Sequence, residues 1–68
     1  MTRVEVISIS ILKDNDFVTI CNSLSSNDLS SLQIKDKINA QNFLLLSSDE
    51  KAEICDILSD MCKKHASK

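Results

Sequence analysis

Apolar and polar residues alternate along the first stretch of the chain. Residues 3–12 read RVEVISISIL, in which isoleucines alternate with serines over the last part of the run. A period of two in a segment rich in β-branched residues is typical of a strand with one buried face. The sequence therefore predicts a β-strand at about 3–12. A turn should follow at residues 13–16, KDND, where polar turn-forming residues cluster.

The next segment, residues 17–24, fits two different structures. Its apolar residues have the i, i+3, i+4, i+7 spacing of a helical face, with an N-cap available in the preceding turn: Phe17, Ile20, Cys21 and Leu24. The composition equally suits a second strand at 17–22, which would close a hairpin with the first. If the segment is a helix, the first strand has no partner within the chain and must pair with another molecule.

Two similar stretches farther along predict helix starts. LSSND at 24–28 and LSSDE at 46–50 each combine serines with acidic residues, which suit the positive end of a helix. The second forms a capping box of Ser47 and Glu50. The region between them has a less regular helical pattern, with a break expected near 39–42.

These elements predict an α+β fold within a single small domain, residues 1–68. An N-terminal β-strand or hairpin, at about 3–12 and 17–22, is followed by two or three α-helices. The last of these helices is expected at about 48–65.

Composition narrows the class of protein. The 68 residues include no glycine, no proline and only two aromatic residues, both phenylalanine. Such a short chain builds a thin core, so we expect a homodimer or a core completed on a partner. The missing glycines exclude glycine-rich phosphate-binding loops.

Charge and cysteine content bear on partners and location. The net charge of −2 argues against nucleic-acid binding, which needs clustered basic residues. No apolar run approaches the roughly 18 residues of a membrane span, and we expect no signal peptide. Three cysteines, an odd number, favour a reducing compartment. We therefore expect a cytoplasmic protein without a membrane partner.

The cysteines and the single histidine are the candidates for chemistry. On a helix, Cys55, Cys62 and His65 share a face with apolar residues, but seven residues place the two cysteines about 10.5 Å apart along the axis. Neither a disulfide nor one zinc ion spans that gap. Cys62 and His65 supply half a metal site at most, and Cys21 or a second subunit would have to complete it. We expect buried, hydrophobic cysteines, with no metal and no cofactor.

No catalytic residue is predicted either. A serine or cysteine nucleophile needs a base, and the only histidine lies in the last turn of the last helix. We do not expect an enzyme.

An acidic stripe marks the opposite face of the last helix. Four carboxylates follow the spacing i, i+4, i+7, i+11 and fall within roughly 60° of arc along about 16 Å of helix. These partner-binding candidates are Asp49, Glu53, Asp56 and Asp60. One interpretation is a solvated face; the other is a docking surface for another protein with a basic surface.

The function expected first is that of a small non-enzymatic protein–protein interaction module. It would be a regulator or inhibitor that acts by stoichiometric binding to a partner protein. Such proteins are common products of phages and mobile elements, and the abundant Asn, Lys, Ile and Ser fit an AT-rich genome. A viral protein of this kind would act in the host cytoplasm.

Two alternatives remain. ISISILKDNDFVTICNSLSS, residues 7–26, resembles the ribbon-helix-helix family of dimeric DNA-binding regulators, in which a strand pairs across the dimer and two helices follow. The resemblance implies that Ser8 and Ser10 would face the DNA major groove. The other alternative is a small assembly co-chaperone or structural subunit, which would use the apolar run Phe43–Leu46.

Overall fold

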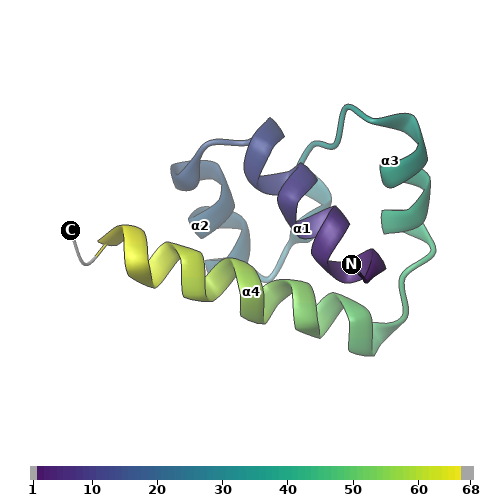
Figure 1. The fold of residues 1–68 in the computed structure, drawn as a ribbon. Helices are drawn as coiled ribbons and strands as arrows, with labels where there is room; N and C mark the ends of the chain where they lie inside the picture. Colours follow the sequence, from purple (N-terminus) through teal and green to yellow (C-terminus); the bar gives the residue numbers. More distant parts are fainter. Residues whose placement is uncertain (1, 67–68) are drawn as a thin grey trace.

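Helices are the regular elements of the part of the chain that the structure describes. The computed structural model describes residues 2–66, and within this range it contains helices but no strand (Figure 1). In chain order the elements are α1 (Arg3–Asp14), α2 (Phe17–Ser25), the short 3-10 helix η1 (Leu29–Ser31), α3 (Lys37–Leu44) and α4 (Ser48–Ala66). The predicted α+β fold is therefore wrong.

The N-terminal strand predicted at 3–12 is the helix α1. Thr2 caps it by accepting a hydrogen bond from the Glu5 N–H. The residues buried by α1 follow the helical spacing i, i+3, i+4, i+7: Val4, Ile7, Ser8 and Ile11. The alternation of isoleucine and serine did not identify the structure, because so short a run fits the period of a strand and the period of a helix equally well. Ile9, which a strand would bury, is 52% exposed.

The two serines of this segment bond within their own helix. Ser8 Oγ donates to the Val4 carbonyl (2.8 Å), and Ser10 Oγ donates to the Val6 carbonyl (3.1 Å). This i−4 bond lets a serine sit in a helix without an unsatisfied hydroxyl. The resemblance to ribbon-helix-helix proteins depended on a strand here, so the implied DNA contacts of Ser8 and Ser10 have no structural basis.

Residues 17–24 adopt the helical alternative, and the second strand at 17–22 is wrong. Asp16 caps α2 by accepting the Thr19 N–H at 2.7 Å. The helix ends at Ser25, and Asn27 two residues later is left-handed, with φ of 55°. Asparagine tolerates this conformation better than other non-glycine residues, which matters in a chain without glycine. The chain then turns into η1, so the helix start predicted at 24–28 produces only a 3-10 turn.

The helix α3 crosses the region in which a break was expected. Asp36 caps it by accepting the Ile38 N–H at 2.9 Å. The helix continues through residues 39–42 without interruption and ends at Leu44. The break lies one turn later, at residues 45–47.

The last helix and its capping box are confirmed. The helix predicted at about 48–65 is α4. The Glu50 N–H donates to Ser47 Oγ, and the Ser47 N–H donates to Glu50 Oε1, both at 3.2 Å. These local bonds repeat the reciprocal pattern that the sequence predicts.

The core lies where α1 and α2 pack against α4. In Figure 1, α4 runs beneath both helices, while α3 packs beside α1, above the end where α4 begins. The buried apolar side chains come from all three packed helices and two connecting segments: Val4, Ile7, Ile11, Ile20, Leu32, Leu46, Ile54 and Leu58. Across residues 2–66, none of the helices combines the length and apolarity that a membrane-spanning helix requires.

Candidate functional site

An apolar cavity of about 790 Å³ lies between α3 and α4. We call it the α3–α4 groove. Its walls come from α3 and the first turns of α4, and its floor from η1 and the segment that follows. The lining residues are Asn27, Leu29, Ser30, Leu32, Ile34, Ala40, Phe43, Leu44, Ser48, Lys51, Ala52 and Cys55.

The α3 wall of the groove is lightly packed. The helix α3 has no buried residue along its length. Phe43 reaches the core from its last turn and is half-buried, and Leu46 just beyond it is buried. Between these two anchors Leu44 is 78% exposed and Leu45 is 72% exposed. The wall is thus anchored at its end and leaves leucine surface open beside the groove.

Hydrogen bonds to α1 position this wall and the floor. Asn39 Nδ2 donates to Ser10 Oγ at 3.1 Å, which ties α3 to α1. The Asn15 side chain bonds both backbone groups of Gln33, donating to its carbonyl (2.8 Å) and accepting its N–H (3.0 Å). The Lys35 N–H donates to Asp14 Oδ2 at 2.9 Å. The C-terminal end of α1 therefore sets the course of the chain into α3.

The α4 wall is made of small side chains. Ser48, Ala52 and Cys55 follow the spacing i, i+4, i+7, so they lie in one row along about 10.5 Å of the helix. Cys55 is a free, half-buried thiol. Small side chains on one helix allow a second helix to approach closely.

An ion pair holds the start of α4 against the start of α1. Arg3 Nε donates to Glu50 Oε2 (2.9 Å), and Arg3 Nη2 donates to Glu50 Oε1 (2.5 Å). The bond from Arg3, followed by that from the Ser47 N–H, lowers the pKa of the Glu50 carboxyl from 4.5 to about 2. The same pairing raises the pKa of Arg3.

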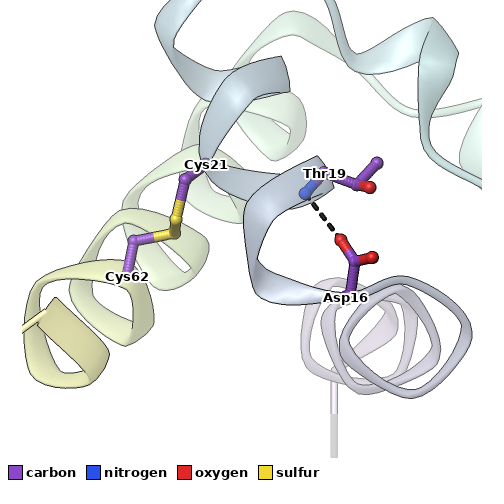
Figure 2. Close-up of a disulfide and its surroundings, with 4 residues drawn as sticks. All are labelled: Asp16, Thr19, Cys21 and Cys62. Carbon is purple, nitrogen blue, oxygen red and sulfur yellow. Dashed lines mark hydrogen bonds between the residues drawn. A yellow bond between two sulfur atoms is a disulfide. The ribbon is translucent and has the colours of Figure 1, made fainter.

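At the other end of α4, Cys21 and Cys62 form a disulfide (Figure 2). Their Cα atoms are 6.2 Å apart, although 41 positions separate them in sequence. Nearby, the rings of Phe17 and His65 stack with centroids 4.3 Å apart. Because residue 17 stacks on residue 65 and residue 21 is bonded to residue 62, α2 and α4 run antiparallel. The expectation of reduced, hydrophobic cysteines is therefore wrong for this pair.

The disulfide also leaves no free thiol on either cysteine for the metal site that the sequence analysis considered. Cys62 and Cys21 bond each other, and His65 stacks on a phenylalanine. Within the described chain, no three His, Cys, Asp or Glu side chains gather as metal ligands. Spacing along one helix gave no sign of this pairing because the partner lies on a different helix.

The four candidate residues of the acidic stripe all lie exposed on α4: Asp49, Glu53, Asp56 and Asp60. They face away from the buried Ile54 and Leu58. The helical positions of the stripe adjoin the small-residue row, with Asp56 one turn beyond Ala52. Helical spacing therefore places Asp49 and Asp56 beside the outer edge of the α4 wall.

The groove itself was not predicted, although one of its signals was present in the sequence. The run Phe43–Leu46 is more apolar than a solvent-exposed turn needs, and two of its side chains line the groove. Comparison with known protein families, with curated proteins and with solved structures finds no match to this chain.

Proposed function

We propose that this chain is a non-enzymatic protein–protein interaction module that binds an apolar segment of a partner protein in the α3–α4 groove. In that role it would act as a stoichiometric regulator or inhibitor. One observation carries the proposal: an open apolar groove bordered by Leu44, which leaves 78% of its surface in water. Fully burying a leucine contributes about 1.5–3 kcal/mol, so a partner that covers this side chain gains affinity.

The shape of the site favours a peptide segment over a small molecule. A small-molecule site typically buries most of its ligand in a concave cavity. Here apolar surface continues past the groove onto Leu45, which is 72% exposed. An extended apolar strip beside a groove suits a helix or peptide that lies along it.

The lining chemistry supports binding rather than catalysis. The lining residues that carry reactive side chains are the serines, Lys51 and Cys55, and His65 lies at the far end of α4, stacked on Phe17. The His65 imidazole, stacked on Phe17 at the far end of α4, is therefore not placed to activate the groove thiol or hydroxyls, as histidine-assisted nucleophilic catalysis would require.

A peptide selection tests the proposal with a matched pair of variants. The folded chain is used to select 16-residue peptides from a random displayed library, and the affinity of each selected peptide is measured. Leu44→Asp places a charge at the groove, and Val18→Asp places one at a similarly exposed position on α2, where Val18 is 70% exposed. Both substitutions cost little stability because both sites are on the surface.

We expect selected peptides to lose at least tenfold in affinity to Leu44→Asp, since one buried leucine is worth about 1.5–3 kcal/mol. Val18→Asp should leave their affinity unchanged. If no selected peptide depends on Leu44, the groove is not the binding site and the proposal fails.

A further inference from the structure

We infer that the occupant of the α3–α4 groove is an amphipathic helix of another protein that carries a basic edge facing α4. This inference rests on the proposed function and adds the chemistry of the partner. It follows from the shape of the two walls, from the charges on their rims, and from the charge of the chain itself.

The walls have the form that accepts a helix. On α4, the row Ser48, Ala52 and Cys55 extends over two turns with small side chains. On α3, Ala40 and Leu44 face the groove one turn apart. Helices pack by placing side chains of one into grooves between side chains of the other, at axial distances set by side-chain size. If a third helix lay in the groove, its leucine-sized side chains would pack over the small-residue row of α4. On the other wall they would contact Leu44 of α3.

The two rims differ in charge. Asp49 and Asp56 are exposed on the outer edge of the α4 wall, next in helical position to Ser48 and Ala52. The exposed Lys37 shares the groove-facing side of α3, since it precedes Ala40 and Leu44 by three and seven residues. A helix in the groove would therefore place basic side chains toward α4 and neutral or acidic ones toward α3. Lys51 also lines the groove and belongs to α4, but helical spacing places it on the opposite side of the small-residue row from Asp49 and Asp56, so the acidic charge lies on the outer rim.

A second copy of the chain fits this groove poorly. The chain has a net charge of −2, and its longest helix carries the acidic stripe. Packing the α4 helices of two copies together would bring like charges close to one another, which complementary interfaces avoid. A partner helix with a basic edge would pair with the carboxylates of this rim and would avoid that repulsion.

Three designed peptides test the charge of the partner edge. Each is a 16-residue helix with the same leucine face, and one flank of that face carries lysine, glutamine or glutamate. Each is titrated into ¹⁵N-labelled protein at low and at high salt, with the amide resonances of Ala52 and Leu44 as the readout. Solution mass at the same concentrations shows whether the free chain dimerises.

We expect the lysine peptide to bind about tenfold more tightly than the glutamine peptide at low salt, from two or more exposed ion pairs. The glutamate peptide should bind most weakly, and high salt should narrow all differences. Asp56→Lys should abolish the preference for the lysine peptide over the glutamine and glutamate peptides. Glu5→Lys makes the same charge change on the exposed surface of α1 and should preserve it; circular dichroism checks that both variants fold.

The outcomes separate this inference from the proposed function. If the three peptides shift the groove resonances with equal affinity, a partner segment binds but the basic edge is wrong. If none of them shifts these resonances and no selected peptide depends on Leu44, the proposed function fails as well. Dimerisation of the free chain that shifts the groove resonances on dilution would show that a second copy is the occupant, and would overturn the inference.

Discussion

The two short helices α2 and α3 are nearly equal in length, 9 and 8 residues, but they are held in different ways. The helix α2 buries Ile20 and Ser23 and is joined to α4 by the Cys21–Cys62 disulfide. The helix α3 buries no residue and depends on its cap, one side-chain bond to α1 and the anchors at its C-terminal end. One helix completes the core, and the other leaves apolar surface exposed.

The difference shows how a chain of this size can combine a packed core with exposed apolar surface. A thin core cannot bury every apolar residue, so some apolar surface remains exposed. Here the exposed leucines are concentrated at the C-terminal end of α3, Leu44 and Leu45, while the covalent link is placed at the opposite end of α4. The covalent link and the exposed leucine surface therefore lie at separate ends of the longest helix.

The largest expected effect comes from breaking the disulfide. A loop of 41 residues closed by a disulfide stabilises a protein by about 4 kcal/mol in the chain-entropy description. A chain of 68 residues has a total stability of roughly 3–10 kcal/mol. We expect Cys21→Ser to remove a large part of that stability, measured as the midpoint of urea unfolding followed by circular dichroism.

Two controls accompany this measurement. Cys55→Ser removes the free thiol and should shift the midpoint only slightly, while a dithiol reductant added to the natural chain should reproduce the effect of Cys21→Ser. An unchanged midpoint under reductant would mean that the disulfide does not hold α2 on α4 in solution.

A medium effect comes from removing the caps of the two short helices. Asp16→Ala and Asp36→Ala each delete a side chain that accepts backbone N–H bonds at a helix start, worth about 1 kcal/mol. In α2, which is packed into the core, the loss should lower global stability. In α3, which buries no residue, it should increase local opening instead. Equal urea midpoints for the two variants would contradict this comparison.

Amide hydrogen exchange is the measurement that separates these two responses. Asp36→Ala should speed exchange within residues 38–44 and leave α2 and α4 protected. Asp16→Ala should speed exchange in the packed helices together, because α2 opens only when the core does.

The smallest effect concerns acid and the start of α4. The pKa of Glu50 is about 2 in the folded chain, held down by Arg3, against an ordinary value of 4.5. A carboxyl with a lowered folded pKa stabilises the fold above its unfolded pKa, and this contribution is lost as the pH falls from about 4.5 toward 2. Because the pair is exposed, we expect a modest drop in melting temperature over that interval.

Glu50→Gln tests this assignment. The variant should melt at a lower temperature than the natural chain near neutral pH, and the two should converge as the pH approaches 2. If the difference between them does not change between pH 6 and pH 2, the ion pair does not contribute to the acid response.

Local signals in the sequence predicted some of these features. The capping box of Ser47 and Glu50 and the helix that follows were predicted correctly because they depend on residues within one turn of each other. For residues 17–24 the spacing allowed the helix that forms, together with an N-cap, but also allowed a strand. The candidate acidic stripe was correctly placed on an exposed helix face, since helical spacing alone determines which residues share a side.

Tertiary packing decided the rest. Residues 3–12 satisfy a strand period and a helix period alike, and burial of Val4, Ile7 and Ile11 against α4 selects the helix. The disulfide and the α3–α4 groove join residues far apart in the chain, so no local pattern shows which segments meet there. The sequence by itself determined where helix α4 begins and which of its faces carries charge. Only the folded chain determined what lies beside that helix, because spatial proximity between distant segments depends on how the whole core packs.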